Sequence, residues 1–324
     1  MKIKKLSVIA LLLTVVMLFG ACSVGEIKST EEEARVVAYC GDHEIRYEEL
    51  RYLVVRYKAD FSAQYGENVF EDAETGAEYE ETLRVLVEAA LRDSYAIVDQ
   101  CETRQIRAGD KVTRQEVQEY VDETVELLGG RDEYLAYLDA NGMNDTVFRF
   151  NTAILSCQYR YYEALAEEKD REAYDAVLAG DGFIRTVSIF VKNDPGENEE
   201  ENRAMAQTVV DAVRAGASVE DYIGTRYNQD TSDCDYVFMR GYFIEEYEDV
   251  AFALDIDEVS DVVETADGFY VIQRRAVESD YFGANVDTLK AMYLSCLMND
   301  ETRALAQSMT VTWAENAPTL WSLQ

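Results

Sequence analysis

Apolar residues recur at intervals of three and four along the first half of the chain, which is the spacing of amphipathic helices. Residues 46–65 and 79–101 each place one apolar stripe along a predicted helix. Before them, residues 36–39 and 44–45 are strand-like and flank a Gly41-Asp42 turn. The beginning of the chain therefore predicts a short hairpin followed by two long helices.

Helix-ending residues divide the next stretch. Thr113-x-x-Glu116 has the form of a capping box and predicts a helix that Gly129 ends. A short helix is expected over 131–140, and Asn144 is expected to cap a long helix that runs to about residue 168. The N-terminal region is thus predicted to be largely helical.

The pattern changes after residue 182, where strand-like and helical segments alternate. The predicted order is a strand over 185–191, a helix ended by Gly216, a helix capped by Ser218, a strand over 236–239, a helix over 247–254, and strands over 259–263 and 269–272. Asp267-Gly268 between the last two strands is a hairpin signal. This order predicts a small α+β module, and a final helix is expected over 287–313.

The module resembles the parvulin (PpiC-type) peptidyl-prolyl isomerase domain. The matching segments, in order, are GASV at 216–219, YNQD at 227–230, YEDVAFAL at 247–254, DEVSDVV at 257–263 and GFYVI at 268–272. The block at 247–254 is the most specific, because the family shows Phe-Glu-Asp-x-Ala-Phe-x-Leu there. The resemblance covers 182–277 and implies a compact isomerase domain.

The resemblance also suggests candidate catalytic residues. The family carries a histidine on its first strand and another on its last, and those positions fall on Ser188 and Tyr270. Asp230 falls where family members carry Cys or Asp. Ser188 and Tyr270 can still donate and accept hydrogen bonds. Asp230, Ser188 and Tyr270 are therefore the candidate catalytic residues.

Three aromatic residues, Phe238, Phe243 and Tyr247, fall where the family lines its proline pocket with apolar side chains. Rotation about a peptide bond faces a barrier of about 18–20 kcal/mol, and the reaction requires a dry apolar socket and no covalent intermediate. The resemblance implies that these three side chains form that socket. The alternative for each of them, taken singly, is ordinary core packing.

The N-terminal region carries a second resemblance. VAYCGDHEI at 37–45, YEEL at 47–50 and EYLAYLDANGM at 133–143 are similar to segments of the PrsA/SurA-type extracytoplasmic foldases. That family implies a helical chaperone-like domain over 34–181, which the C-terminal segment 278–324 completes. The expected fold class is α+β, with the module at 182–277 inserted into a discontinuous helical domain.

The first residues have the composition of a secretory leader. Three lysines precede an apolar run that ends at residue 19, and Gly20-Ala21-Cys22 matches a bacterial lipobox. We expect residues 1–21 to be a lipoprotein signal peptide, Cys22 to be lipidated, and residues 22–33 to form a polar tether. The alternatives are an ordinary signal peptide with a chance cysteine and a transmembrane anchor, for which the apolar run is short. The expected location is extracytoplasmic, on a bacterial cell membrane.

The chain is strongly acidic, with a formal net charge of −34. Removing residues 1–21 takes away three lysines and no acidic residue, so the net charge becomes more negative still. Such a chain does not bind nucleic acid through its phosphates, and anionic lipid repels it, so membrane attachment would rest on the lipid. The charge either keeps an exposed surface soluble or attracts basic unfolded chains or cations.

Metal-binding residues are scarce. After Cys22 there are five cysteines without a C-x-x-C pair, and the single histidine, His43, is expected in an exposed turn. No zinc site and no cofactor are therefore expected. Cys101, Cys157 and Cys296 fall in helical patterns and are expected to pack as small apolar residues; a disulfide between two of them is the alternative.

These observations favour a lipid-anchored foldase that binds newly exported, unfolded polypeptides and isomerises their X-Pro bonds. The second hypothesis is a holdase chaperone whose parvulin-like module is catalytically inactive. A third hypothesis is a solute-binding lipoprotein, but the repeated βα units of its two lobes are not visible in the pattern. The oligomeric state and the client proteins are not encoded in any motif.

Overall fold

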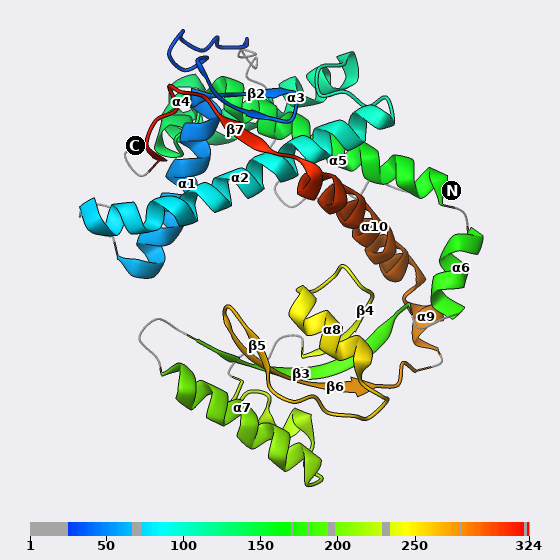
Figure 1. Ribbon diagram of the computed structural model, residues 1–324. Coiled ribbons are helices and arrows are strands. Elements are labelled where there is room, and N and C mark those ends of the chain that lie inside the picture. The colour runs from blue at the N-terminus through cyan, green and yellow to red at the C-terminus, as the bar shows by residue number, and fades with distance from the viewer. Residues whose placement is uncertain are drawn as a thin grey trace.

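The computed structural model describes residues 25–66, 73–169, 171–179, 182–193, 198–228, 234–278, 280–320 and 323. Residues 1–21, Cys22 and Asp230, which carry predictions made above, lie outside the described residues. Figure 1 shows a group of long helices above a smaller α+β unit, joined by α6, α9 and α10.

The upper unit, which we call the helical lobe, is formed by the two ends of the described chain. Its elements are β1 (Val36–Cys40), β2 (His43–Arg46), α1 (Tyr47–Tyr65), α2 (Ala73–Thr103), α3 (Lys111–Leu128), α4 (Arg131–Ala140), α5 (Asp145–Glu168), α10 (Val286–Ser308) and β7 (Val311–Trp313). Two short helices, α6 (Arg171–Ala179) and α9 (Tyr281–Ala284), lie at the crossings to the lower unit.

The helical lobe is organised around α2, which packs against α1, α5 and α10. Apolar side chains of α1 and α2, predicted as stripes, form a buried cluster with the small antiparallel sheet β2-β1-β7. Asn144 caps α5 as predicted, because its Oδ1 accepts a hydrogen bond of 3.0 Å from the backbone N of Val147.

Two predictions for the lobe were wrong. Asp110, not Thr113, caps α3: the Asp110 carboxylate accepts from the Thr113 backbone N at 2.8 Å, and Thr113 is buried inside the first turn. The last helix does not run to residue 313. It ends at Ser308, and Val311–Trp313 is a strand, β7, in which Trp313 pairs with Ala38 of β1.

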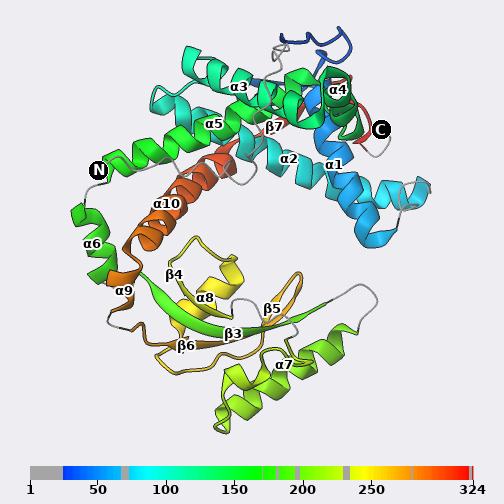
Figure 2. The same ribbon diagram turned by 180° about the vertical axis from the view of Figure 1, so that it is seen from behind.

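The lower unit, which we call the module, contains β3 (Ile184–Lys192), α7 (Glu199–Arg214), a 3₁₀ turn η1 (Val219–Tyr222), β4 (Asp235–Phe238), α8 (Glu245–Ala253), β5 (Val263–Thr265) and β6 (Gly268–Arg275). Its sheet is antiparallel with the order β4-β3-β6-β5. Helix α7 covers one face and α8 the other, with α8 on the side of the helical lobe (Figures 1 and 2). The predicted α+β class is confirmed.

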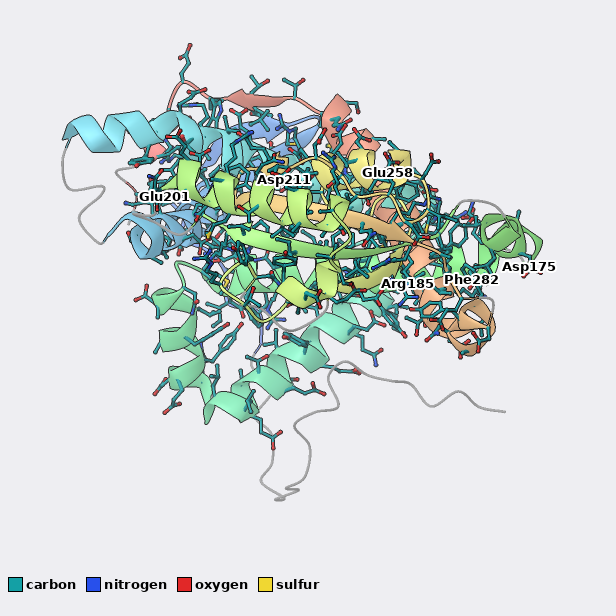
Figure 3. All side chains as sticks on the ribbon, turned by 90° about the horizontal axis from the view of Figure 1, so that it is seen from below. Asp175, Arg185, Glu201, Asp211, Glu258 and Phe282 are labelled. Atoms are coloured by element: carbon teal, nitrogen blue, oxygen red, sulfur yellow. The ribbon has the colours of Figure 1, made fainter. Side chains whose placement is uncertain are left out.

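Alternation along the strands assigns each side chain to a face. Val187, Ile189 and Val191 of β3 pack with α7, whereas Ile184 of the same strand and Ile272 of β6 pack with α8. The sheet is therefore buried on both sides. Figure 3 looks onto α7, where the labelled Glu201 and Asp211 lie on the exposed side of the helix.

The β5–β6 hairpin differs in detail from its prediction. Its turn residues are Ala266 and Asp267, and Gly268 is already the first residue of β6. A Cβ on Gly268 would lie 2.3 Å from the carbonyl oxygen of Val191 in β3, so the absence of a side chain permits the pairing. The strand expected over 259–263 is displaced, because Val259 makes only one bridge, to Gln273.

The segment capped by Ser218 is a single 3₁₀ turn where a helix was predicted. All strand pairings among the described residues are antiparallel, so this part of the chain contains no repeated parallel βα unit of the kind that the solute-binding hypothesis requires. No helix in the described ranges is both long enough and apolar enough to span a bilayer.

Candidate functional site

The candidate site lies on the α8 face of the module sheet. Ser188 of β3 and Tyr270 of β6 both belong to this face, because Ser188 is four residues along its strand from Ile184, Tyr270 is two residues along its strand from Ile272, and both isoleucines pack under α8. In the ladder, Phe190 pairs with Tyr270 and Ser188 pairs with Ile272. The two strands thus bring the predicted polar positions close together.

Tyr247 of α8 lies between these two positions. Its hydroxyl donates a hydrogen bond to Ser188 Oγ at 3.1 Å and lies 2.8 Å from Thr186 Oγ1. Its ring meets that of Tyr270 edge to face, with centroids 5.1 Å apart. Burial raises the pKa of Tyr247 to about 12, so the hydroxyl stays protonated. Tyr247 therefore links Ser188 to Tyr270, two of the residues that the sequence analysis predicted as catalytic.

Rings continue across this face in a series that we call the aromatic band, namely Tyr236, Phe243, Tyr247, Tyr270 and Phe190. Successive centroids are 5.0, 4.8, 5.1 and 4.3 Å apart. Tyr236, Phe243, Tyr270 and Phe190 are half-buried, whereas Tyr247 is 1% exposed. Offset and edge-to-face contacts of this kind stabilise a fixed arrangement of rings.

The three predicted pocket residues are brought together but differ in exposure. Phe238 lies 4.8 Å from Phe243 and 5.9 Å from Tyr247, measured between ring centroids. Phe238 is 0% exposed and Tyr247 1%, so both lie beneath the surface, and Phe243 is the member that solvent reaches. Ser188 is also buried. The exposed part of the predicted site is therefore Phe243 with Tyr270.

A residue of the candidate site that the sequence analysis missed is Glu248, next to Tyr247 on α8. Its buried carboxylate accepts hydrogen bonds of 2.9 Å from three consecutive backbone N–H groups, at Gly241, Tyr242 and Phe243. This fixes the loop that presents Phe243. The Glu within the YEDVAFAL block was visible in the sequence, but its contact with a loop five to seven residues earlier was not.

The electrostatics around the band are acidic. Glu245 and Glu246 are exposed in the first turn of α8, where acids complement the helix dipole. Burial raises the pKa of Tyr270, and the nearby negative charge of Asp267 raises it further. The surface near Phe243 and Tyr270 thus combines apolar rings with negative charge.

A hollow in the module lies on the opposite side of the sheet. It has a volume of about 720 Å³ and is lined by α7 residues that include Asn202 and Met205, together with Arg226 and Tyr227. Met205 and Tyr227 pack against the α7-side cluster, so this hollow is separate from the aromatic band.

The module is in apolar contact with the helical lobe through α10. Val237 and Met239, at the end of β4, pack against a cluster that contains Leu289 and Tyr293 of α10. Met292 of the same helix packs against the cluster under α8. The α8 face of the module, which carries the candidate site, therefore packs against α10, the helix through which the chain re-enters the helical lobe.

The prediction of an exposed His43 was wrong. His43 is half-buried, its Nε2 lies 2.7 Å from Asp99 Oδ1, and its ring stacks on Tyr95 with centroids 4.5 Å apart. The residue after the turn thus packs against α2, and the local sequence does not indicate this contact. Elsewhere in the described chain, no group of three or more His, Cys, Asp or Glu side chains is placed to hold a metal ion.

Comparison with known proteins adds structural likenesses. No protein-family profile and no curated protein match the sequence. Among solved structures, the peptidylprolyl isomerase PrsA from Bacillus anthracis is 17% identical over 67% of this chain and 92% of its own, with a TM-score of 0.36. The foldase protein PrsA from Streptococcus pneumoniae is 16% identical over 88% and 93%, with a TM-score of 0.36.

A third structure comes from work on two SurA-like chaperones of Campylobacter jejuni. It is 9% identical over 86% of this chain and 99% of its own, with a TM-score of 0.27. The chain spans nine tenths or more of each of these three proteins.

Proposed function

We propose that this chain is an extracytoplasmic foldase that binds newly exported, unfolded polypeptides and isomerises their X-Pro bonds. The proposed organisation is a signal peptide over 1–21, a tether over 22–33, a helical domain over 34–181 completed by 278–324, and an isomerase module over 182–277. The observation that supports this best is the aromatic band, in which Tyr247 joins Ser188 to Tyr270 on one face of the sheet.

The proposed chemistry needs no covalent step. A proline ring rests on the half-buried rings of Phe243 and Tyr270, while Phe238 and Tyr247 form the packed floor beneath them. Apolar contact removes water from the prolyl bond, which lowers the energy of the less polar twisted amide relative to the planar one. Asp230, Ser188 and Tyr270 remain the proposed catalytic residues, with Ser188 acting through its hydrogen bond to Tyr247.

A second function, that of a catalytically inactive holdase, is favoured by one specific observation. The hydroxyls of Ser188 and Tyr247 are buried and engaged with each other, so neither faces a bound peptide. The helical lobe also exposes apolar side chains on the adjoining helices α3 and α5, among them Tyr120, Leu155 and Tyr159. Such side chains would bind unfolded segments without any isomerase chemistry.

A protease-coupled assay with a proline-containing peptide, run on the full chain, separates the two functions. The isomerase accelerates the cis-to-trans step, and Phe243→Ala lowers kcat/KM about tenfold or more, equivalent to at least about 1.4 kcal/mol. Phe282→Ala, at a half-buried ring of α9 outside the band, leaves the rate unchanged. A rate equal to the uncatalysed one, with suppression of client aggregation intact, assigns the holdase function instead.

Membrane attachment is proposed to rest on lipidation of Cys22. Two acyl chains hold a protein stably on a bilayer, whereas the acidic body is repelled by anionic lipid. Expressed with its leader, the native chain fractionates with membranes, and Cys22→Ser releases it from them. Equal membrane fractions for both proteins, measured after a carbonate wash, would remove lipidation from the proposal.

A further inference from the structure

Two cysteines of the helical lobe are direct neighbours in space although 55 residues separate them in the chain. Cys101 lies near the end of α2 and Cys157 in the middle of α5, and both are fully buried. The two thiols are hydrogen-bond partners of each other. None of the five described cysteines is in a disulfide.

The environment makes the two thiols unequal. The hydrogen bond from Cys101 lowers the pKa of Cys157, and the positive charge of Arg160 lowers it further. The same hydrogen bond, together with burial, raises the pKa of Cys101. The hydrogen bond holds each sulfur beside the other, and the thiolate of either cysteine is the form that reacts.

The pair lies in the apolar cluster that seats α10. The same cluster contains Tyr161 of α5 and Leu289 and Tyr293 of α10. Arg104, one turn beyond Cys101, forms an ion pair with Glu301 of α10 at 3.0 Å. A covalent link between α2 and α5 at this level would therefore fix the surface on which the returning helix rests.

We propose that Cys101 and Cys157 are a disulfide site, oxidised by thiol–disulfide exchange with an extracytoplasmic oxidoreductase or a small-molecule disulfide. Sulfurs that already hydrogen-bond need only a short approach to reach the S–S bond length of about 2.05 Å. Such bonds form and persist in oxidising compartments. The proposal rests on the proposed extracytoplasmic location, but it does not depend on isomerase or holdase function.

Atoms and electrons balance in this thiol–disulfide exchange when a disulfide is the oxidant. The thiolate of one cysteine of the pair attacks one sulfur of the oxidant, forming a mixed disulfide and releasing one oxidant thiolate. The other cysteine then loses its proton and attacks the sulfur of the first, which releases the second oxidant thiolate. The two protons from the cysteines end on the two released thiols, so the protein loses two hydrogens and the oxidant gains them.

The other cysteines are in different surroundings. Cys40 is in β1 and Cys296 in α10, and burial raises the pKa of each to about 11. Cys234 precedes β4, where its sulfur accepts a hydrogen bond of 3.2 Å from Asn228. The expected pairing is therefore specific, with Cys40, Cys234 and Cys296 remaining reduced.

Burial determines when oxidation takes place. Both thiols are inaccessible in the folded lobe, so the exchange occurs during folding, before the packing of α2, α5 and α10 around them is complete. We expect glutathione disulfide to link the pair rapidly when it is present during refolding of the reduced chain. The same reagent added to the folded, reduced protein should react at least about tenfold more slowly.

The test is a peptide map of the full chain refolded with a glutathione disulfide and glutathione mixture, unfolded and alkylated without reductant. The expected product contains two hydrogens fewer than the fully reduced chain. Its peptide map shows a linked peptide pair with Cys101 and Cys157, while Cys40, Cys234 and Cys296 are alkylated. Alkylation of both Cys101 and Cys157, or a link from either of them to another cysteine, overturns the proposal.

Variants provide matched controls. Cys157→Ser and Cys101→Ala abolish the link, whereas Cys296→Ser, another buried helical cysteine, retains it. The oxidised wild-type chain should unfold at a temperature about 5 °C or more above the reduced chain, because the bridge restricts a loop of more than fifty residues in the unfolded state. Identical unfolding temperatures before and after reduction would contradict a stabilising bond.

Discussion

The Tyr247 hydroxyl donates to Ser188 Oγ at 3.1 Å, and this bond connects α8 to β3, one of the two central strands of the module sheet. Thr186 Oγ1, two residues earlier on β3, lies 2.8 Å from the same hydroxyl. All three side chains are buried. A single side chain of α8 thus engages two adjacent side chains of one face of β3, which fixes where the helix sits on the sheet.

Replacing Tyr247 with Phe tests this relationship. The variant keeps the ring contacts with Phe243 and Tyr270 and removes only the hydroxyl, which leaves Ser188 and Thr186 without their shared partner. We expect a loss of about 1–2 kcal/mol in the free energy of unfolding, measured by urea titration. Tyr270→Phe, at a half-buried ring, is the control and should cost less than about 0.5 kcal/mol.

An unchanged urea midpoint for Tyr247→Phe would show that the buried hydroxyls contribute no net stability. A drop in isomerase or holdase activity without any loss of stability would instead place the hydroxyl in the function of the site. The two measurements therefore distinguish a structural from a functional role for the bond to Ser188.

Much of the module could be predicted from local sequence. The apolar alternation in 185–191 assigned the strand, and the same alternation places Ser188 on the face opposite Val187 and Ile189. The block at 247–254 predicted α8 within two residues of its observed ends. These features depend on residues that are close in the chain, which is why pattern alone was sufficient.

Long-range pairing explains what the sequence did not reveal. β7 has three residues, and its partner Ala38 lies 275 positions earlier, so no local pattern distinguishes it from the end of a helix. The contact of His43 with Asp99 likewise depends on how the first hairpin meets α2. At the candidate site, the sequence left pocket lining and core packing open for each aromatic residue, and only the folded arrangement shows that Phe238 and Tyr247 are buried.

Glu248 is predicted to position Phe243. Glu248→Ala removes the acceptor for three backbone N–H groups and should destabilise the chain by about 2–3 kcal/mol, because hydrogen bonds to a charged group are stronger than neutral ones. Glu248→Gln keeps an oxygen acceptor and should lose roughly half as much. Urea unfolding of the two variants measures this order.

Asp249→Asn, at the exposed neighbour of Glu248, is the matched control and should change the unfolding free energy by less than about 0.5 kcal/mol. If Glu248→Ala unfolds at the wild-type urea concentration, the loop at 241–243 does not depend on the carboxylate. The peptide assay then tells whether Phe243 is still presented correctly.

Two glycines with positive φ test the close approach of β6 to β3. Gly268 has φ of 149°, and an added Cβ would meet the Val191 carbonyl oxygen at 2.3 Å, whereas Gly216 has φ of 106° and open space around it. Gly216→Ala should cost about 1 kcal/mol for backbone strain alone. Gly268→Ala should cost at least about 2 kcal/mol more, because β3 and β6 must separate.

Thermal unfolding of both glycine variants gives the comparison directly. Equal destabilisation would mean that the β3–β6 ladder relaxes around the new methyl group without cost. The expected inequality would confirm that Gly268 is required by packing between strands, not by the hairpin turn.

Glu49 of α1 is expected to make stability depend on pH. Burial raises the pKa of its carboxyl from 4.5 to about 7, even though the Tyr95 hydroxyl donates to it at 3.0 Å. Because the folded chain holds this proton more tightly than the unfolded chain, stability is greatest below pH 4.5 for this group and falls as the pH rises to about 7. The loss amounts to about 1–3 kcal/mol.

Glu49→Gln isolates this contribution from the titration of the many other acids. Glutamine can still accept the hydrogen bond from Tyr95, but it has no charge to bury. We expect wild type and variant to have similar urea midpoints at pH 5, and the variant to be more stable by about 1–3 kcal/mol at pH 8. Because both proteins share every other acidic group, parallel stability curves across this range would show that Glu49 ionises in the folded chain as it does in water.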